Sequence, residues 1–205
     1  MKDRPRAGIG RRPLAGAATL LALPAIAAPA GLGRVEDMRG EATAEAGGTR
    51  RALAPAMPVF DGDLVATGEE ARVRLRLAEA IEVLLGGGVR LRIDRFLARR
   101  GGTLVLERGA ALVDRAARGG APPPDLTVRG PFGLIAVRGT RFFAGPSNGA
   151  FGVFVERGAV LLVGGDQGVE VLPGFGADVA QPGAAPTAPV RWGQARIAAA
   201  LASVT

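Results

Sequence analysis

The chain has 205 residues, of which 48% are hydrophobic and 22% charged, enough for one ordinary domain with an apolar core. Its 32 glycines and 15 prolines leave little room for long helices, because both residues destabilise helix interiors. The chain contains no Cys, His or Tyr, which excludes thiol nucleophiles, disulfides, His-ligated metals and Ser-His-Asp triads. We therefore expect a protein that is not an enzyme and uses no cofactor.

The net charge of +7 is unevenly distributed along the chain. Residues 1–27 carry five basic residues and one acidic residue, which contributes +4 and leaves only +3 for the rest. A basic balance of this kind is weak evidence for a polyanionic partner. Nine aromatic residues also offer few platforms for base stacking. We expect no nucleic-acid partner.

The first thirty residues have the order of a secretory signal. A basic segment precedes an apolar run over 13–24, followed by small-residue cleavage sites at Ala25-Ile26-Ala27 and at 28–30. The pair Arg11-Arg12 resembles a twin-arginine signal, with an ordinary secretory signal as the alternative. The apolar run is shorter than the ~20 residues that span a bilayer. We expect a signal peptide over 1–30, export to the periplasm and no membrane span.

Further along, Asp61-Gly62-Asp63 precedes an expected strand over 64–67 that ends at Thr67. A calcium loop would need further oxygen ligands along the segment, and the chain does not supply them at the required spacing. Asp and Gly also form turns, because Asp accepts local backbone hydrogen bonds and Gly adopts positive φ. We interpret Gly62 and Asp63 as parts of a turn and expect no metal site.

Strict alternation over 72–77 places three apolar residues on one face of a strand and Arg72, Arg74 and Arg76 on the other. The segment 89–94 repeats this pattern with Arg90 and Arg92. If the two strands pair, the five arginines form a basic face. That face would bind an acidic protein surface or an anionic envelope polysaccharide. The alternative is a solvated sheet face, neutralised by nearby glutamates, that protects against aggregation.

Short strands continue to the end of the apolar part of the chain. We expect them at 103–107, 111–114, 126–129, 134–137, 141–144, 151–156, 160–163 and 169–172. Many short strands without intervening helices predict an all-β sandwich, roll or solenoid. A ragged apolar stripe over 192–204 predicts one short helix in an Ala/Pro-rich tail, 183–205.

Two segments of the chain resemble each other. Glu107-Arg108-Gly109 and Glu156-Arg157-Gly158 each follow one apolar strand and precede another, 49 positions apart. We expect the glycine to adopt positive φ in a tight hairpin. The similarity suggests an internal duplication, whose halves are joined by the Gly/Pro-rich loop 119–124.

Seven short motifs occur in a characteristic order at 33–35, 60–68, 71–75, 101–109, 137–142, 154–160 and 171–174. In order and spacing they resemble the FecR domain over residues 33–182. The most recognisable motif is Arg138-Gly139-Thr140. We interpret Gly139 as a bend and Thr140 as a buried hydrogen-bonding residue, and Arg138 as a partner contact or half of an ion pair. Gly158 belongs to a later motif of the same kind.

The resemblance implies an all-β periplasmic domain, here 31–182, that works through protein contacts. In the best-known members a cytoplasmic anti-sigma segment and a membrane helix precede the domain, which receives a signal from an outer-membrane transducer. We expect neither element here, so sigma-factor binding does not carry over. The implied partner is an inner-membrane sensor, an anti-sigma regulator or an outer-membrane protein. The alternative is an envelope-structural or polysaccharide-binding module without a signalling role.

Overall fold

The computed structural model describes residues 31–78, 80–97, 101–115 and 125–205. The predicted export residues Arg11, Arg12, Ala25 and Ala27 and the predicted loop 119–124 lie outside this part of the chain. Among the described residues, no helix is long and apolar enough to cross a membrane.

The fold is all-β, as the sequence predicts, and its described residues form sixteen strands in one continuous sheet that folds back on itself into two layers. Layer A contains β4 (Pro58–Val59), β1 (Gly33–Arg39), β6 (Arg72–Leu77), β7 (Ile81–Leu85) and β10 (Ala111–Arg115). Layer B contains β3 (Thr49–Ala52), β2 (Ala42–Ala46), β5 (Leu64–Thr67), β8 (Arg90–Leu97), β9 (Gly101–Arg108) and β11 (Asp125–Gly130).

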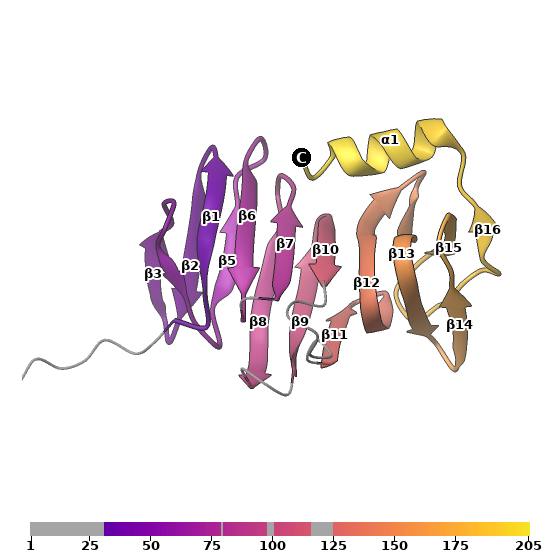
Figure 1. The fold of residues 1–205 in the computed structure, drawn as a ribbon, viewed down its shortest axis with the longest axis horizontal. Helices are drawn as coiled ribbons and strands as arrows, with labels where there is room; N and C mark the ends of the chain where they lie inside the picture. The colour runs from indigo at the N-terminus through magenta and orange to yellow at the C-terminus, as the bar shows by residue number, and fades with distance from the viewer. Residues whose placement is uncertain (1–30, 79, 98–100, 116–124) are drawn as a thin grey trace, which may run out of the picture.

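The two layers are joined by β12 (Gly133–Ser147) and β13 (Ala150–Gly164), which each pass from one layer into the other. Beyond them, β14 (Gln167–Val171) extends layer B, whereas β15 (Phe175–Val179) and β16 (Val190–Arg191) extend layer A. The described strand pairs are antiparallel except β9 with β11. Both layers progress along the molecule from the N-terminal strands at one end to the C-terminal strands at the other (Figure 1).

The main core lies between the layers. Alternation along β6 directs Val73, Leu75 and Leu77 inward, where at most 2% of each residue is exposed. From layer B, Leu91 and Leu104 join the same apolar cluster. Burial of such side chains is the main force that holds the layers together.

Along one edge of the sandwich, the chain crosses between the layers at glycines. These corners contain Gly40, Gly68, Gly86–Gly88, Gly109, Gly139 and Gly158. Backbone hydrogen bonds join successive corners, as from Gly68 N to Glu41 O (2.8 Å) and from Gly88 N to Gly68 O (3.0 Å). The corners therefore form a hydrogen-bonded stack.

The hairpins expected at the two Glu-Arg-Gly segments are wrong. Gly109 and Gly158 do adopt positive φ, +89° and +79°. However, β9 and β10 lie in different layers and do not pair, and Gly158 lies inside β13. The bend thus redirects one strand into the other layer instead of reversing it. For the same reason, the strands expected at 134–137 and 141–144 are a single strand, β12, bent at Gly139.

The predicted helix is present as α1 (Gln194–Ala202), slightly shorter than the expected 192–204. It begins after Gly193 and lies along one end of the strands, across β12 and β13 (Figure 1). The Ala/Pro-rich segment before it therefore brings the helix back onto layer A.

Gly158→Ala should destabilise the fold more than Gly139→Ala. Both glycines have positive φ, which costs an L-residue roughly 1–2 kcal/mol. Only at Gly158 would a new Cβ also approach backbone, 2.6 Å from Gly139 O, whereas at Gly139 it meets no atom within 4 Å. Urea unfolding of the two variants measures the difference, and equal losses would contradict the close approach.

Candidate interaction surface

The outward face of layer A carries its side chains in three rows that run across the strands, because neighbouring strands are in register. The small row contains Gly86, Ala110, Gly145 and Gly152. The apolar row contains Leu84, Leu112, Phe143 and Phe154. The charged row contains Arg76, Glu82, Asp114, Arg141 and Glu156.

Helix α1 lies over the small and apolar rows. The buried residues Ala200 and Val204 belong, with Trp192, to the same apolar cluster as the apolar row. The helix approaches closely because the small row leaves space: a Cβ on Gly86 would overlap Ser203 O. The small residues thus form a trough, and the larger apolar residues form its inner wall.

Trp192 anchors the start of the helical segment. Its ring stacks on Phe154, with centroids 5.2 Å apart, and lies against Gly152 and Gly176, where a Cβ would overlap it. The Arg196 guanidinium lies 3.6 Å from the ring centroid, within the range of a cation–π interaction. Arg196 also bonds Asp178 of β15, at 2.6 and 3.1 Å. Stacking, shape and charge therefore fix this end of α1.

The charged row is held by ion pairs between neighbouring strands. Arg76 donates to Glu36 at 2.8 Å and to Glu82 at 2.9 Å. At the other end of the row, Arg141 pairs with Asp114 and Glu156. The hydrogen bonds from Arg76 hold the pKa of Glu36 below its ordinary value of 4.5. These arginines are thus engaged within the sheet.

The expected five-arginine face does not form. Strand β6 pairs with β1 and β7, whereas β8 pairs with β5 and β9 in the other layer. Arg90 and Arg92 of β8 both lie 3.2 Å from Glu107. The reason is the intervening strand β7, which takes the place beside β6 before the glycine corner leads the chain to layer B.

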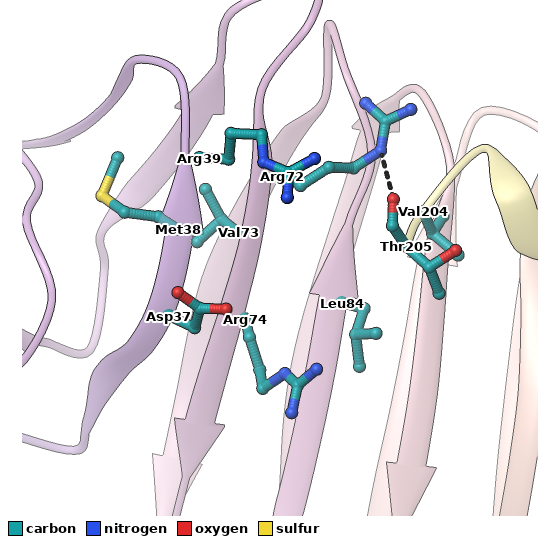
Figure 2. Close-up of a pocket in the computed structure, with 9 residues that line it drawn as sticks. All are labelled: Asp37, Met38, Arg39, Arg72, Val73, Arg74, Leu84, Val204 and Thr205. Atoms are coloured by element: carbon teal, nitrogen blue, oxygen red, sulfur yellow. Dashed lines mark hydrogen bonds between the residues drawn. The ribbon is translucent and has the colours of Figure 1, made fainter.

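Arg72 and Arg74 remain on layer A and line a groove of about 330 Å³ beside the end of α1 (Figure 2). Its nine lining residues are Asp37, Met38, Arg39, Arg72, Val73, Arg74, Leu84, Val204 and Thr205. Arg72 Nε donates to Thr205 O at 3.1 Å and Nη2 donates to Ala202 O at 3.5 Å. Arg74 has a 47% exposed side chain and is 3.8 Å from Glu82.

The Asp61-Gly62-Asp63 segment bonds to protein groups. Buried Asp63 accepts two hydrogen bonds from Arg51, which raise the pKa of that guanidinium, and a third from Phe60 N at 2.8 Å. Asp61 accepts one from Phe96 N at 2.8 Å. Gly62 has φ +85°. In the described part of the chain, no group of three or more His, Cys, Asp or Glu residues is placed to hold a metal.

The two motif threonines lie at layer corners. The Thr67 hydroxyl donates to Gly86 O at 2.7 Å and accepts from Val89 N at 2.9 Å, which links two corners. Buried Thr140 donates to Ala159 O at 2.8 Å, beside Gly139 and Gly158. The backbone of Arg138 pairs opposite Ala159, and its side chain lies outside the described atoms. These motif residues are therefore separate from the groove.

The sequence reasoning did not identify the trough. Its signal was present in the strands, since Leu84, Leu112, Phe143 and Phe154 each stand two positions from a charged residue on the same outward face. A row of outward apolar residues needs a cover. Asp37 and Arg39 were also missed, because their strand, β1, was not among those predicted from alternation.

Gly176→Ala should displace Trp192, the chain's single tryptophan. The expected result is a red shift of tryptophan emission and a stability loss of about 1–3 kcal/mol, as for other overpacked sites. The matched control is Gly193→Ala, because a Cβ there meets no atom within 4 Å. Unchanged emission for Gly176→Ala would contradict the described seat of the ring.

The Glu36–Arg76 pair should make stability depend on acid pH. The pKa of Glu36 is lower in the folded state than its ordinary value of 4.5, so the pair stabilises the fold at pH values above 4.5. This contribution is lost as pH falls through the lowered pKa. Urea unfolding between pH 6 and pH 3 should show a smaller loss for Glu36→Gln than for the unchanged protein. Parallel curves would contradict the assignment.

This sandwich is similar to known proteins in sequence and in fold. Residues 63–161 match the family model FecR, described as FecR protein. Two crystal structures of a putative anti-sigma factor from Parabacteroides distasonis ATCC 8503, at 1.65 and 2.50 Å resolution, have a similar fold, each with a TM-score of 0.56 and 16% identity. They cover 67% of this chain, which spans 64% and 63% of theirs, less than two thirds of their length.

At this identity the likeness shows the fold alone, and a comparison with curated proteins finds no match. The family match includes the motifs at Asp63, Thr67, Gly139 and Gly158, which all lie at turns or corners of the sandwich. It also includes the strands that carry the apolar row. Residues 63–161 are thus similar to the FecR family.

Proposed function

We propose that this protein is a non-catalytic module of the bacterial periplasm that binds another envelope protein in signalling. The FecR match supports a regulatory role, and the signal-like order of residues 1–30 supports export. The fold shared with a putative anti-sigma factor is consistent with signalling. The partner would be an inner-membrane sensor, an anti-sigma regulator or an outer-membrane protein.

The observation that carries this proposal is the outward face of layer A. Helix α1 covers only part of the rows, and the remaining groove presents Arg39 and Arg74 to solvent. A surface of exposed arginines is suited to protein recognition, because Arg is enriched at interfaces.

The two serine hydroxyl groups also support a non-catalytic role. The chain has two serines, and both have structural partners. Ser147 accepts from Arg196 Nε at 2.9 Å, and Ser203 donates to Ala200 O at 2.7 Å. Neither serine has a histidine to activate it, since the chain contains none. The described contacts of these hydroxyls therefore serve the placement of α1.

Photo-crosslinking in living cells tests the proposal. A crosslinking residue replaces Arg74 in one variant and Arg92 in a control, whose side chains are 47% and 43% exposed but lie on opposite layers. We expect Arg74 to capture a defined envelope sensor, anti-sigma regulator or outer-membrane protein, identified by mass spectrometry, and Arg92 not to capture it. Capture of polysaccharide alone would show that this surface binds a polymer and not a protein. Capture of a cytoplasmic protein would overturn export.

A further inference from the structure

The rows that seat α1 continue beyond the helix. In register, Leu84 lies opposite Arg74 of β6, which lies opposite Asp37 of β1. In the small row, Arg72 lies opposite Arg39. The groove of Figure 2 is therefore an extension of the trough that α1 occupies.

The chemistry of the trough changes along this extension. Under α1 the small and apolar rows contain only glycine, alanine and large apolar residues. Where the same two rows continue over β6 and β1, they contain three arginines and one carboxylate: Arg39, Arg72, Arg74 and Asp37. Three arginines and one aspartate give the lining side chains a net charge of +2. Leu84 and Val204, which are 6% and 2% exposed, form the buried edge of the groove beside α1, and Met38 packs toward the core between the layers.

Two of the three arginines are placed to meet a ligand. Arg39 is exposed, and Arg74 has its described ion-pair contact at 3.8 Å with Glu82, which Arg76 holds more closely at 2.9 Å. Arg72 instead holds the end of α1 through Thr205 O and Ala202 O. Arg72 thus forms the boundary between the occupied and the open part of the trough.

We propose that this groove binds an acidic segment of the partner protein, in line with α1. Carboxylates of the segment pair with Arg39 and Arg74. The inference rests on the proposed function, because it assumes a protein partner.

Fluorescence anisotropy with a labelled probe peptide tests this binding. The probe is Glu-Glu-Leu-Glu-Glu-Leu-Glu-Glu, and the same peptide with Lys for Glu should not bind. We expect Arg39→Ser with Arg74→Ser to weaken binding about tenfold, the upper part of the range for two exposed ion pairs. The matched control is Arg90→Ser with Arg92→Ser, which changes the net charge equally on layer B and should alter affinity less than twofold.

Further measurements separate the outcomes. Trp192 emission checks that α1 stays in place in the groove variant. Equal losses in the two double variants would show a response to net charge and overturn the site. If dextran sulfate binds more tightly than the peptide, with the same dependence on Arg39 and Arg74, the ligand of the groove is an anionic polysaccharide and not an acidic peptide.

The inference and the proposed function fail in different ways. If crosslinking at Arg74 captures an envelope protein but the acidic probe does not bind, the groove chemistry is wrong and the protein-binding role stands. If the probe binds through Arg39 and Arg74 but crosslinking captures no protein in cells, the groove chemistry holds, whereas the proposed signalling role fails.

Discussion

The passage of the chain between two layers is the constraint on which this structure depends. Each crossing must bend a strand sharply while its backbone groups keep hydrogen-bond partners. Glycine supplies the bend, as at Gly158, where φ is +79° and neighbouring backbone leaves no space for a side chain. The Thr67 hydroxyl supplies bonds to Gly86 O and Val89 N. The residues of the FecR motifs therefore serve mainly to form the corners between the layers.

Because the corners set the register of the strands, they also create the surface features. Neighbouring strands of layer A bring Leu84, Leu112, Phe143 and Phe154 into a single row, although they are far apart in sequence. Such a row cannot remain exposed without cost, and α1 and Trp192 together cover it. Where the row changes from apolar to charged, at Arg74, the helix ends and the groove begins.

The same register explains why a basic chain has no broad basic face among its described strands. Most outward arginines meet a carboxylate on the next strand, as Arg76 meets Glu36 and Glu82, and Arg141 meets Asp114. Such cross-strand pairs stabilise a sheet modestly. Arg39 and Arg74 differ from these arginines because both are exposed, and the Glu82 carboxylate beside Arg74 is bonded more closely by Arg76.

Local pattern alone was enough for the all-β class, for strands such as 72–77 and for the terminal helix, because alternation and glycine placement depend on neighbours in sequence. It was not enough for strand partners. Arg72 and Arg90 were expected on one face, yet β7 separates them, and Glu-Arg-Gly bends between layers where a hairpin was expected. Which strands pair depends on contacts distant in sequence, so only the folded sheet could form the trough, the helix seat and the groove.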